Sequence, residues 1–193
     1  DILYDDSNSL TGEIVYGTRN RLGLISGANI IIANTAENGA KNQANGSDII
    51  INGGIIVYPT DTLYGFGVDA RNRSAIEKLN EIKKRETPIS VIAWSLDIVR
   101  SWSNIKYTDF EIAKKVLLES NTIIVPIKNN IVDNSILAKD SSLGVRIPHH
   151  NYPINLCKNL NFPITTTSVN RAGENSLNDP QLISDKFSNE IDL

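Results

Sequence analysis

The chain has 193 residues, 40% of them hydrophobic and 21% charged, which is enough to bury the core of one domain, with or without an appendage. The formal net charge of −3 excludes a globally basic protein, so any contact with RNA requires a local basic patch. No apolar run reaches the roughly 18 residues of a membrane-spanning helix and no signal-peptide pattern is present, which predicts a cytoplasmic protein without membrane contact.

The sequence offers few residues for a metal site or a disulfide. Cys157 is the only cysteine, which excludes a disulfide within the chain and a zinc site made of cysteines alone. It lies in a segment typical of a helix face, so we interpret it as a small, buried structural residue. His149 and His150 are adjacent, and adjacent side chains rarely converge on one ion. No metal-binding residues are therefore predicted.

The composition changes near residue 48. Residues 1–47 are rich in Gly, Asn, Thr and Ala and carry no motif with recognisable chemistry, so we interpret them as an N-terminal extension or linker. Within them, the apolar runs 13–16 and 28–33 predict short strands or one hairpin. A flexible stretch is expected over residues 34–47.

Residues 48–193 alternate between the patterns of strands and helices. Apolar runs that end at turn residues indicate strands, and apolar residues three or four apart indicate helices. This interleaving predicts an α/β sheet covered by helices. The predicted strands are 55–58, 89–94, 122–127, 144–147 and 164–168, and the predicted helices are 73–84, 109–118, 152–160 and 179–187.

Two of these helices carry specific expectations. Either Asn72 or Ser74 is expected to cap the helix over 73–84, because both side chains can accept a hydrogen bond from a free backbone N–H. In the helix over 109–118 one face is apolar, and we expect that face to be buried. Its residues are Ile112, Ala113, Val116 and Leu117.

A polar segment follows the first strand of this region. Residues 59–67 read Pro-Thr-Asp-Thr-Leu-Tyr-Gly-Phe-Gly, so a buried strand breaks into hydroxyls, a carboxylate and two glycines. Ligands bind at strand ends in open α/β sheets, and glycines let a ligand approach the backbone. An ordinary turn carries the same residue types, so this segment alone does not decide between ligand site and turn.

Cations and polar groups also lie at three later element ends. Lys83-Lys84-Arg85 ends a helix, where cations complement the helix dipole or clamp a phosphate. Arg146 points opposite to its apolar strand neighbours, toward solvent or a cleft. Residues 165–173, Thr-Thr-Thr-Ser-Val-Asn-Arg-Ala-Gly, can bind a ribose, a base edge or a phosphate, or cap the next segment.

In their order, these segments resemble the YrdC/Sua5 family from about Ser47 to the C-terminus. The family pattern is Pro-Thr-x-Thr-x-Tyr-Gly-Leu-Gly, then Lys-x-Arg, Val-Arg-x-Pro and Ser-Ala-Asn-x-Ser-Gly. The resemblance implies an open, twisted mixed sheet covered by helices, with a large ligand cavity. It also implies a threonylcarbamoyl-adenylate synthase, which joins L-threonine, bicarbonate and ATP, releases pyrophosphate and serves tRNA threonylcarbamoyladenosine modification through a partner transferase complex.

The resemblance also implies roles for individual residues, but no covalent nucleophile. Anionic reactants meet an anionic triphosphate, so cations and positioning are needed, with Mg²⁺ bridging the phosphates. The implied threonine contacts are Thr62, Tyr64, Arg146 and Ser168, and the implied ATP contacts are Lys83, Arg85, Ser142 and Asn170.

The sequence departs from the family pattern at several places. Residues 118–122 replace a Pro-Gly-Pro-x-Thr segment, and only two residues separate Arg85 from Pro88, so an ATP-contacting asparagine is not identified. Either Ile92 or Trp94 stands where the family has a histidine. The family continues beyond the position of Leu193 into a strand and a Ser-Thr segment that closes the site. We therefore expect a domain truncated at its C-terminus.

Two other functions remain open at this point. A YrdC-like module could bind nucleotide or double-stranded RNA without synthase activity; RNA binding would need a basic face that includes Arg171 and the cations named above. A carbamoyl-transfer domain of hydrogenase maturation normally belongs to a much larger protein with zinc-finger cysteines, and the single cysteine argues against it.

Overall fold

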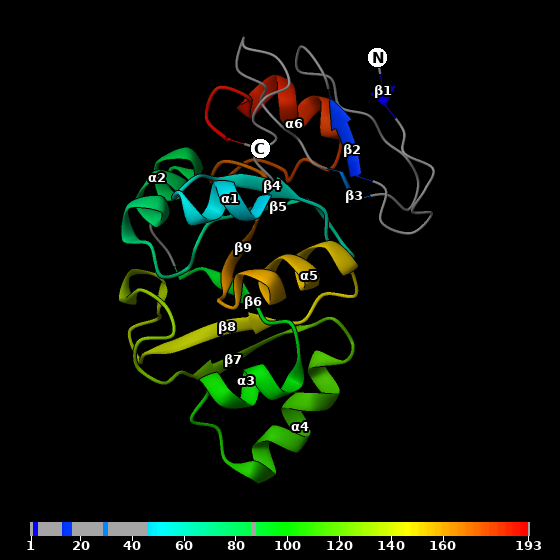
Figure 1. The fold of residues 1–193 in the computed structure, drawn as a ribbon. Coiled ribbons are helices and arrows are strands. Elements are labelled where there is room, and N and C mark those ends of the chain that lie inside the picture. Colours follow the sequence, from blue (N-terminus) through cyan, green and yellow to red (C-terminus); the bar gives the residue numbers. More distant parts are fainter. Residues whose placement is uncertain (1, 4–12, 17–28, 31–45, 86–87, 193) are drawn as a thin grey trace.

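The structure is a computed structural model that describes residues 2–3, 13–16, 29–30, 46–85 and 88–192 (Figure 1). Near the N-terminus, β1 (Ile2–Leu3), β2 (Glu13–Tyr16) and β3 (Asn29–Ile30) pair in that order. Because β2 and β3 run parallel, they are separate strands and do not form a hairpin. The stretch predicted to be flexible, 34–47, lies outside the described residues except for its last two.

The main sheet has six strands in the order β4-β5-β9-β6-β8-β7. Only β6 and β8 pair in parallel; the other neighbours are antiparallel, so the sheet is mixed, as predicted. Long connections between neighbours in space, such as β5 to β9, bring distant motifs together. The strands are β4 (Ile56–Tyr58), β5 (Gly65–Gly67), β6 (Ser90–Ile92), β7 (Thr122–Pro126), β8 (Ser142–Arg146) and β9 (Ile164–Ser168).

Helices cover both faces of this sheet, but unequally. On one face α1 and α5 lie side by side (Figure 1). On the other face α2, α3, α4 and α6 pack against the strands. The helices are α1 (Gly46–Ile51), α2 (Arg73–Lys83), α3 (Leu96–Trp102), α4 (Tyr107–Leu117), α5 (Asn151–Leu160) and α6 (Pro180–Phe187), with a short 3₁₀ turn at Asn134–Ile136.

The alternation of side chains along each strand builds two hydrophobic clusters. In β4, Val57 joins the larger cluster under α2, α3, α4 and α6, whereas Ile56 and Tyr58 join the smaller cluster under α1 and α5. In β6, Val91 and Ile92 divide in the same way. Strands buried on both faces read as continuous apolar runs, which is why the sequence predicted them.

Some predicted details are confirmed and others are wrong. Asn72 caps α2, since its side chain accepts a hydrogen bond from the backbone of Ala75. In α4 the buried residues include Ala113 and Leu117, but Ile112 is 67% exposed, so its predicted burial is wrong. The buried stripe instead begins at Phe110, about one turn before Ala113 and two turns before Leu117.

Cys157 is fully buried in the smaller cluster, in agreement with its predicted structural role. Burial raises the pKa of its thiol to about 12, so the thiolate that reacts with metals and oxidants is disfavoured. Among the described residues, no helix is long and apolar enough to cross a membrane.

Candidate functional site

One part of the sheet face lies outside the hydrophobic cluster of α1 and α5, and we refer to it as the open face. The strand register pairs Gly65 with Ser168 and Ser90 with Thr166, so all four residues face the same side of the sheet. Every second residue of β8, Ser142, Gly144 and Arg146, faces that side as well. At the sheet edge, Ile124 on this side is 75% exposed. The open face consists of small and hydroxyl residues with one cation: Gly65, Ser90, Ser142, Gly144, Arg146, Thr166 and Ser168.

Arg146 contacts the polar segment that follows β4. Its Nη2 donates to Asp61 Oδ1 at 2.6 Å and to Thr62 Oγ1 at 3.3 Å, across 85 and 84 positions of sequence. The side chains of Arg146 and Asp61 are only 17% and 13% exposed, which shields the pair from water. The motifs that carry Thr62 and Arg146 therefore meet in space. Asp61, for which the sequence suggested no role, is the residue that joins them.

The segment between β4 and β5 is held by its own hydroxyls. Thr60 Oγ1 accepts from the backbone N–H groups of Thr62 and Leu63, both at 3.2 Å, and donates to the carbonyl of Leu63 at 2.6 Å. Such local bonds fix a turn without regular secondary structure. Thr60 is thus committed to the loop, and Thr62 is the hydroxyl presented to Arg146.

The surroundings of Asp61 favour its charged form. Burial alone would raise the pKa of Asp61, but the nearby Ser120 hydroxyl and the backbone of His149 lower it, as does the charge of Arg146. The net result is a pKa below the ordinary range, so the pair is ionised at neutral pH. Arg146 Nε is buried and has no partner among the described residues, and their hydrogen bonds to this guanidinium use Nη2 alone.

The adjacent histidines have distinct structural roles. His150 caps α5: its Nδ1 accepts a hydrogen bond from the backbone of Tyr152 at 3.2 Å. Burial lowers the pKa of His150, while the charge of Asp61 acts in the opposite direction. His149 is exposed. No group of three metal-ligating residue types gathers anywhere in the described part of the chain.

Tyr64 lies away from Arg146. Its ring is partly buried against the larger hydrophobic cluster, and its backbone N–H donates to Asn178 Oδ1 at 3.3 Å. Burial, and then the charge of Asp179, raises the pKa of its phenol. Ser142 lies on the open face but is buried, and its hydroxyl donates to Asp140 Oδ1 at 2.6 Å.

The turn that follows β9 is tied to the end of α2. Lys83 Nζ donates to the carbonyls of Ser168 and Asn170, at 2.5 and 3.0 Å, and to Asn170 Oδ1 at 3.3 Å. Arg171 Nη1 donates to the carbonyl of Ile82 at 2.7 Å, and its Nη2 pairs with Glu190 at 2.6 Å. In this arrangement Lys83, which was expected to hold ATP phosphates, is 2% exposed and bonded to protein.

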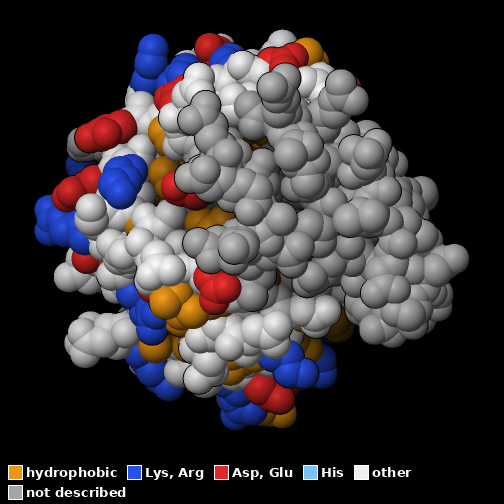
Figure 2. Space-filling model, turned by 45° about the horizontal axis from the view of Figure 1, so that its top comes forward, with side chains coloured by type: hydrophobic (Ala, Val, Ile, Leu, Met, Phe, Trp, Pro, Cys, Tyr) orange, Lys and Arg blue, Asp and Glu red, His pale blue; other side chains and the backbone are white. Residues whose placement is uncertain are grey.

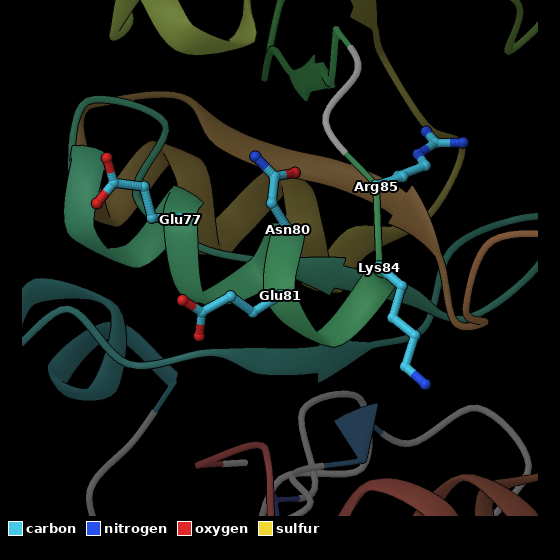
Figure 3. A pocket seen from close by; sticks show the side chains of 5 residues that line it. All are labelled: Glu77, Asn80, Glu81, Lys84 and Arg85. Atoms are coloured by element: carbon cyan, nitrogen blue, oxygen red, sulfur yellow. The ribbon is translucent and has the colours of Figure 1, made fainter.

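Arg85 is exposed just beyond α2, where a phosphate can reach it. Figure 3 shows Lys84 and Arg85 projecting in different directions from this helix end. Both line a pocket of about 490 Å³ with Glu77, Asn80 and Glu81. Glu77, Glu81 and Lys84 lie on the solvent-facing side of α2. Two carboxylates in the pocket also oppose a triphosphate, so we place the site on the open face instead.

Gly67 has a packing role rather than the ligand-approach role predicted for it. A Cβ at Gly67 would lie 2.6 Å from the Tyr58 ring, so only glycine leaves room for that ring. The Tyr58 hydroxyl donates to the carbonyl of Thr165 at 2.9 Å, which ties β4 to β9. At Gly65 a Cβ would make ordinary contact, with its nearest neighbour at 3.5 Å. At Gly65 a side chain would therefore fit, and its absence leaves the open face without a side chain at this position.

Three of the five cations expected in a basic face for RNA binding are buried or paired with a carboxylate. Lys83 is buried, Arg146 is paired with Asp61, and Arg171 is paired with Glu190. Lys84 and Arg85 are exposed. Figure 2 shows Lys and Arg side chains mixed with Asp and Glu on the face it displays, without a continuous basic stripe.

Comparison with known proteins decides the family. A family model described as "Telomere recombination", for Sua5, YciO and YrdC proteins, matches residues 48–193. The chain belongs to the Sua5/YciO/YrdC family. The match includes Arg146 and every other residue of the open face.

Members of the Sua5/YciO/YrdC family share both sequence and fold with this chain. The threonylcarbamoyl-AMP synthase of Xanthomonas axonopodis pv. citri is 35% identical over 127 residues, which cover 63% of this chain and 67% of that protein. The crystal structure of E. coli YciO superimposes with a TM-score of 0.70 and 25% identity, covering 76% of this chain and 73% of YciO. A crystal structure of P. abyssi Sua5 in complex with L-threonine has a TM-score of 0.67 and 23% identity, over 75% of this chain and 43% of that one.

The open face brings together some of the predicted site residues but not all. Arg146 and Thr62 meet, while Ser142 and Ser168 lie on the same side of the sheet as Arg146. The Tyr64 side chain packs against the larger hydrophobic cluster, and the Lys83 side chain bonds to the turn after β9. Asp61 and Thr166 lie in segments that the sequence analysis singled out but were given no role of their own, and Ser90 was missed. For Ser90, its position as a single hydroxyl between the apolar residues Ile89 and Val91 was an available signal.

Proposed function

We propose that this protein is an L-threonylcarbamoyl-AMP synthase, which forms its product and pyrophosphate from L-threonine, bicarbonate and ATP. The product would pass to a transferase complex that modifies tRNA. The proposal is supported by the family, by the 35% identity to a synthase from Xanthomonas and by the L-threonine in P. abyssi Sua5, which has the same fold. The observation that carries it is the shielded cation at the open face, Arg146, held by Asp61 and Thr62.

Arg146 is suited to the carboxylate of an amino acid. Hydrogen bonds to Asp61 and Thr62 fix the guanidinium through Nη2 and Nε is buried, so a carboxylate would use Nη1, with little cost in side-chain ordering. Low exposure strengthens that contact because less water screens it. Thr62 Oγ1 accepts a hydrogen bond from Arg146 Nη2, so it lies next to the proposed carboxylate position and would also contact the bound amino acid.

The reaction requires positioning and charge neutralisation. The amine of threonine condenses with bicarbonate to a carbamate and water, and a carbamate oxygen then attacks the α-phosphorus of ATP, expelling pyrophosphate. Both partners are anionic, so cations must bring them together. Arg85, exposed at the end of α2, is proposed to hold the phosphates. Ser142 would contact the nucleotide, and Ser168 and Asn170 would lie between the two ligands. Because no carboxylate cluster occurs among the described residues, Mg²⁺ would be held mainly by the ATP phosphates.

Pyrophosphate release tests the proposal. The wild-type protein should release pyrophosphate only when L-threonine, bicarbonate and ATP are all present. Arg146→Ala should lower kcat/KM for threonine about 10- to 100-fold, since a charge-assisted contact contributes about 1.5–3 kcal/mol. Arg85→Ala should raise the KM for ATP instead.

Arg73→Ala provides the matched control. Arg73 lies on the exposed start of α2 and pairs with Glu77, and its side chain is 72% exposed. Its removal should leave all kinetic constants unchanged. Release that does not require threonine, or equal effects of Arg146→Ala and Arg73→Ala, would contradict the proposal.

A further inference from the structure

Lys83 is the most deeply buried cation among the described residues. Its residue exposure is 2%, and its Nζ lies 5.6 Å from the centre of the Phe66 ring. A lysine buried to this degree must direct each N–H of its ammonium to an acceptor. All three acceptors, the carbonyls of Ser168 and Asn170 and the Asn170 Oδ1, belong to the turn after β9.

The ammonium is therefore saturated by protein. An ammonium group has three donors and no acceptor, and Lys83 makes three hydrogen bonds. A phosphate could reach Nζ only if one of these bonds broke and the residue moved toward solvent. Arg85, two residues later and exposed, meets a phosphate without that cost.

The bond from Lys83 also determines how Asn170 is oriented. Asn170 Oδ1 accepts from Lys83 Nζ and from Ser168 Oγ, the latter at 2.5 Å. Its amide Nδ2 donates to the carbonyls of Arg171 and Glu174, at 3.0 and 2.9 Å. An amide flipped by half a turn would direct its N–H groups at the ammonium of Lys83, so the positive charge selects one orientation.

The fixed orientation of the Asn170 amide also determines the direction of the Ser168 hydroxyl hydrogen bond. Its single proton is given to Asn170 Oδ1, so its remaining lone pairs can only accept. Ser168 lies on the open face, paired with Gly65. A hydroxyl in this state binds an N–H or O–H donor of a ligand and rejects a bare anionic oxygen.

We propose that Lys83 is a positioning residue that, through Asn170, fixes the Ser168 hydroxyl as a hydrogen-bond acceptor on the open face, where it receives a donor of the amino-acid or nucleoside substrate. This inference rests on the proposed function for the identity of the substrates. The geometry at Lys83 does not depend on that function.

The pKa of Lys83 provides a readout. Burial, and then the neighbouring charge of Arg85, lowers the pKa of Lys83 to about 8. From the other elements packed nearby, Arg171 is neutralised by Glu190. The charged lysine that holds Asn170 is therefore present below about pH 8 and is lost as the pH rises above it. A neutral amine can accept as well as donate, which releases the constraint on the amide.

Trace acetylation of wild-type lysines, read by mass spectrometry with and without ATP, tests the inference independently of turnover. Burial slows acetylation of Lys83 whereas its lowered pKa speeds it, so the deciding comparison is the rate at Lys83 with and without ATP, with Lys84 as the exposed reference. ATP should leave the rate at Lys83 unchanged. Protection of Lys83 from acetylation by ATP, with Lys84 unprotected, would overturn the inference and identify Lys83 as a phosphate ligand.

A variant separates positioning from a merely structural role. Lys83→Met, once shown by thermal unfolding to be folded at the assay temperature, should bind ATP within about threefold of wild type but turn over at least about tenfold more slowly. It should also lose a decline of kcat near pH 8 that the wild type and the control Lys84→Met retain. Weakened ATP binding with unchanged kcat, or an unchanged pH profile, would contradict the inference. If wild-type protein releases no pyrophosphate, the proposed function fails, while acetylation and ATP binding still decide the role of Lys83.

Discussion

The two faces of the main sheet are covered in different ways. On one face, α2, α3, α4 and α6 meet the strands with a continuous set of buried aliphatic and aromatic side chains. On the other, α1 and α5 cover only one part, and the remainder carries small hydroxyl residues beside Arg146. The same strands supply both faces, because their side chains alternate. The candidate binding surface thus lies where the apolar alternation stops and none of the described helices packs.

The comparison predicts that substitutions on the covered face affect stability most. Leu79 in α2 is fully buried, and Leu79→Ala should lower the free energy of unfolding by about 2–5 kcal/mol, because a cavity forms. Ile124, 75% exposed on β7, is the matched control. Ile124→Thr keeps a β-branched side chain and should change the free energy of unfolding by less than about 0.5 kcal/mol. Urea unfolding measures both. Equal losses would mean that the two faces do not differ as described.

The two glycines of β5 face the same side of the sheet but differ in their surroundings: Gly67 packs against the buried Tyr58 ring, whereas Gly65 lies on the open face. Gly67→Ala should lower the free energy of unfolding by about 1–3 kcal/mol, because its Cβ would overlap the buried Tyr58 ring. Gly65→Ala has room and should leave stability nearly unchanged, while its methyl group projects onto the open face. Thermal unfolding and substrate affinity, measured on both variants, check this. A destabilising Gly65→Ala with normal affinity would count against the open face as a ligand surface.

The Asp61–Arg146 pair should make stability depend on pH in acid. The pKa of Asp61 is lowered in the folded protein, so its contribution is present above the unfolded value of about 3.9 and is lost as the pH falls through the folded value. Asp61→Asn should therefore cost on the order of 1–2 kcal/mol at pH 7. The difference from wild type should shrink below about pH 4. A gap that is constant from pH 7 to pH 3 would show that the charge is not responsible.

The smallest expected effect concerns the end of α2. Lys84 adopts a left-handed conformation, with φ 54°, and its N–H and that of Arg85 bond to Glu81 and Asn80. Glycine is favoured at this position of a helix end. Lys84→Gly should raise the free energy of unfolding by up to about 1 kcal/mol without affecting turnover, because Lys84 belongs to the solvent-facing side of α2. Reduced turnover would move the site toward the pocket in Figure 3.

Much of the fold was predictable from sequence for a physical reason. Strands buried on both faces, such as 55–58, are short apolar runs with clear ends, and helices such as α2 have a regular apolar face. The elements that were missed are short: α1 has six residues, and β5 has three, two of them glycine. Such segments contain too few residues for a period to show. For α3, Ser95 was an available capping signal, and it does cap the helix.

The site was predictable only as a set of separate motifs. Nothing in the sequence pairs Asp61 with Arg146, since 85 positions separate them and the contact depends on the folded sheet. The burial of Lys83, by contrast, had a local signal. It follows Ile76 and Leu79 at helical spacing on the buried side of α2, whereas Lys84 falls on the opposite side.

The location of the ligand site is the central claim, and an NMR titration tests it most directly. Backbone amide shifts would be followed as L-threonine is added at a constant concentration of a non-hydrolysable ATP analogue, with D-threonine as the control. The largest changes specific to L-threonine should fall at Thr62, Arg146 and Ser168. Changes concentrated at Glu77, Glu81 and Lys84, or equal changes with both enantiomers, would contradict an amino-acid site on the open face.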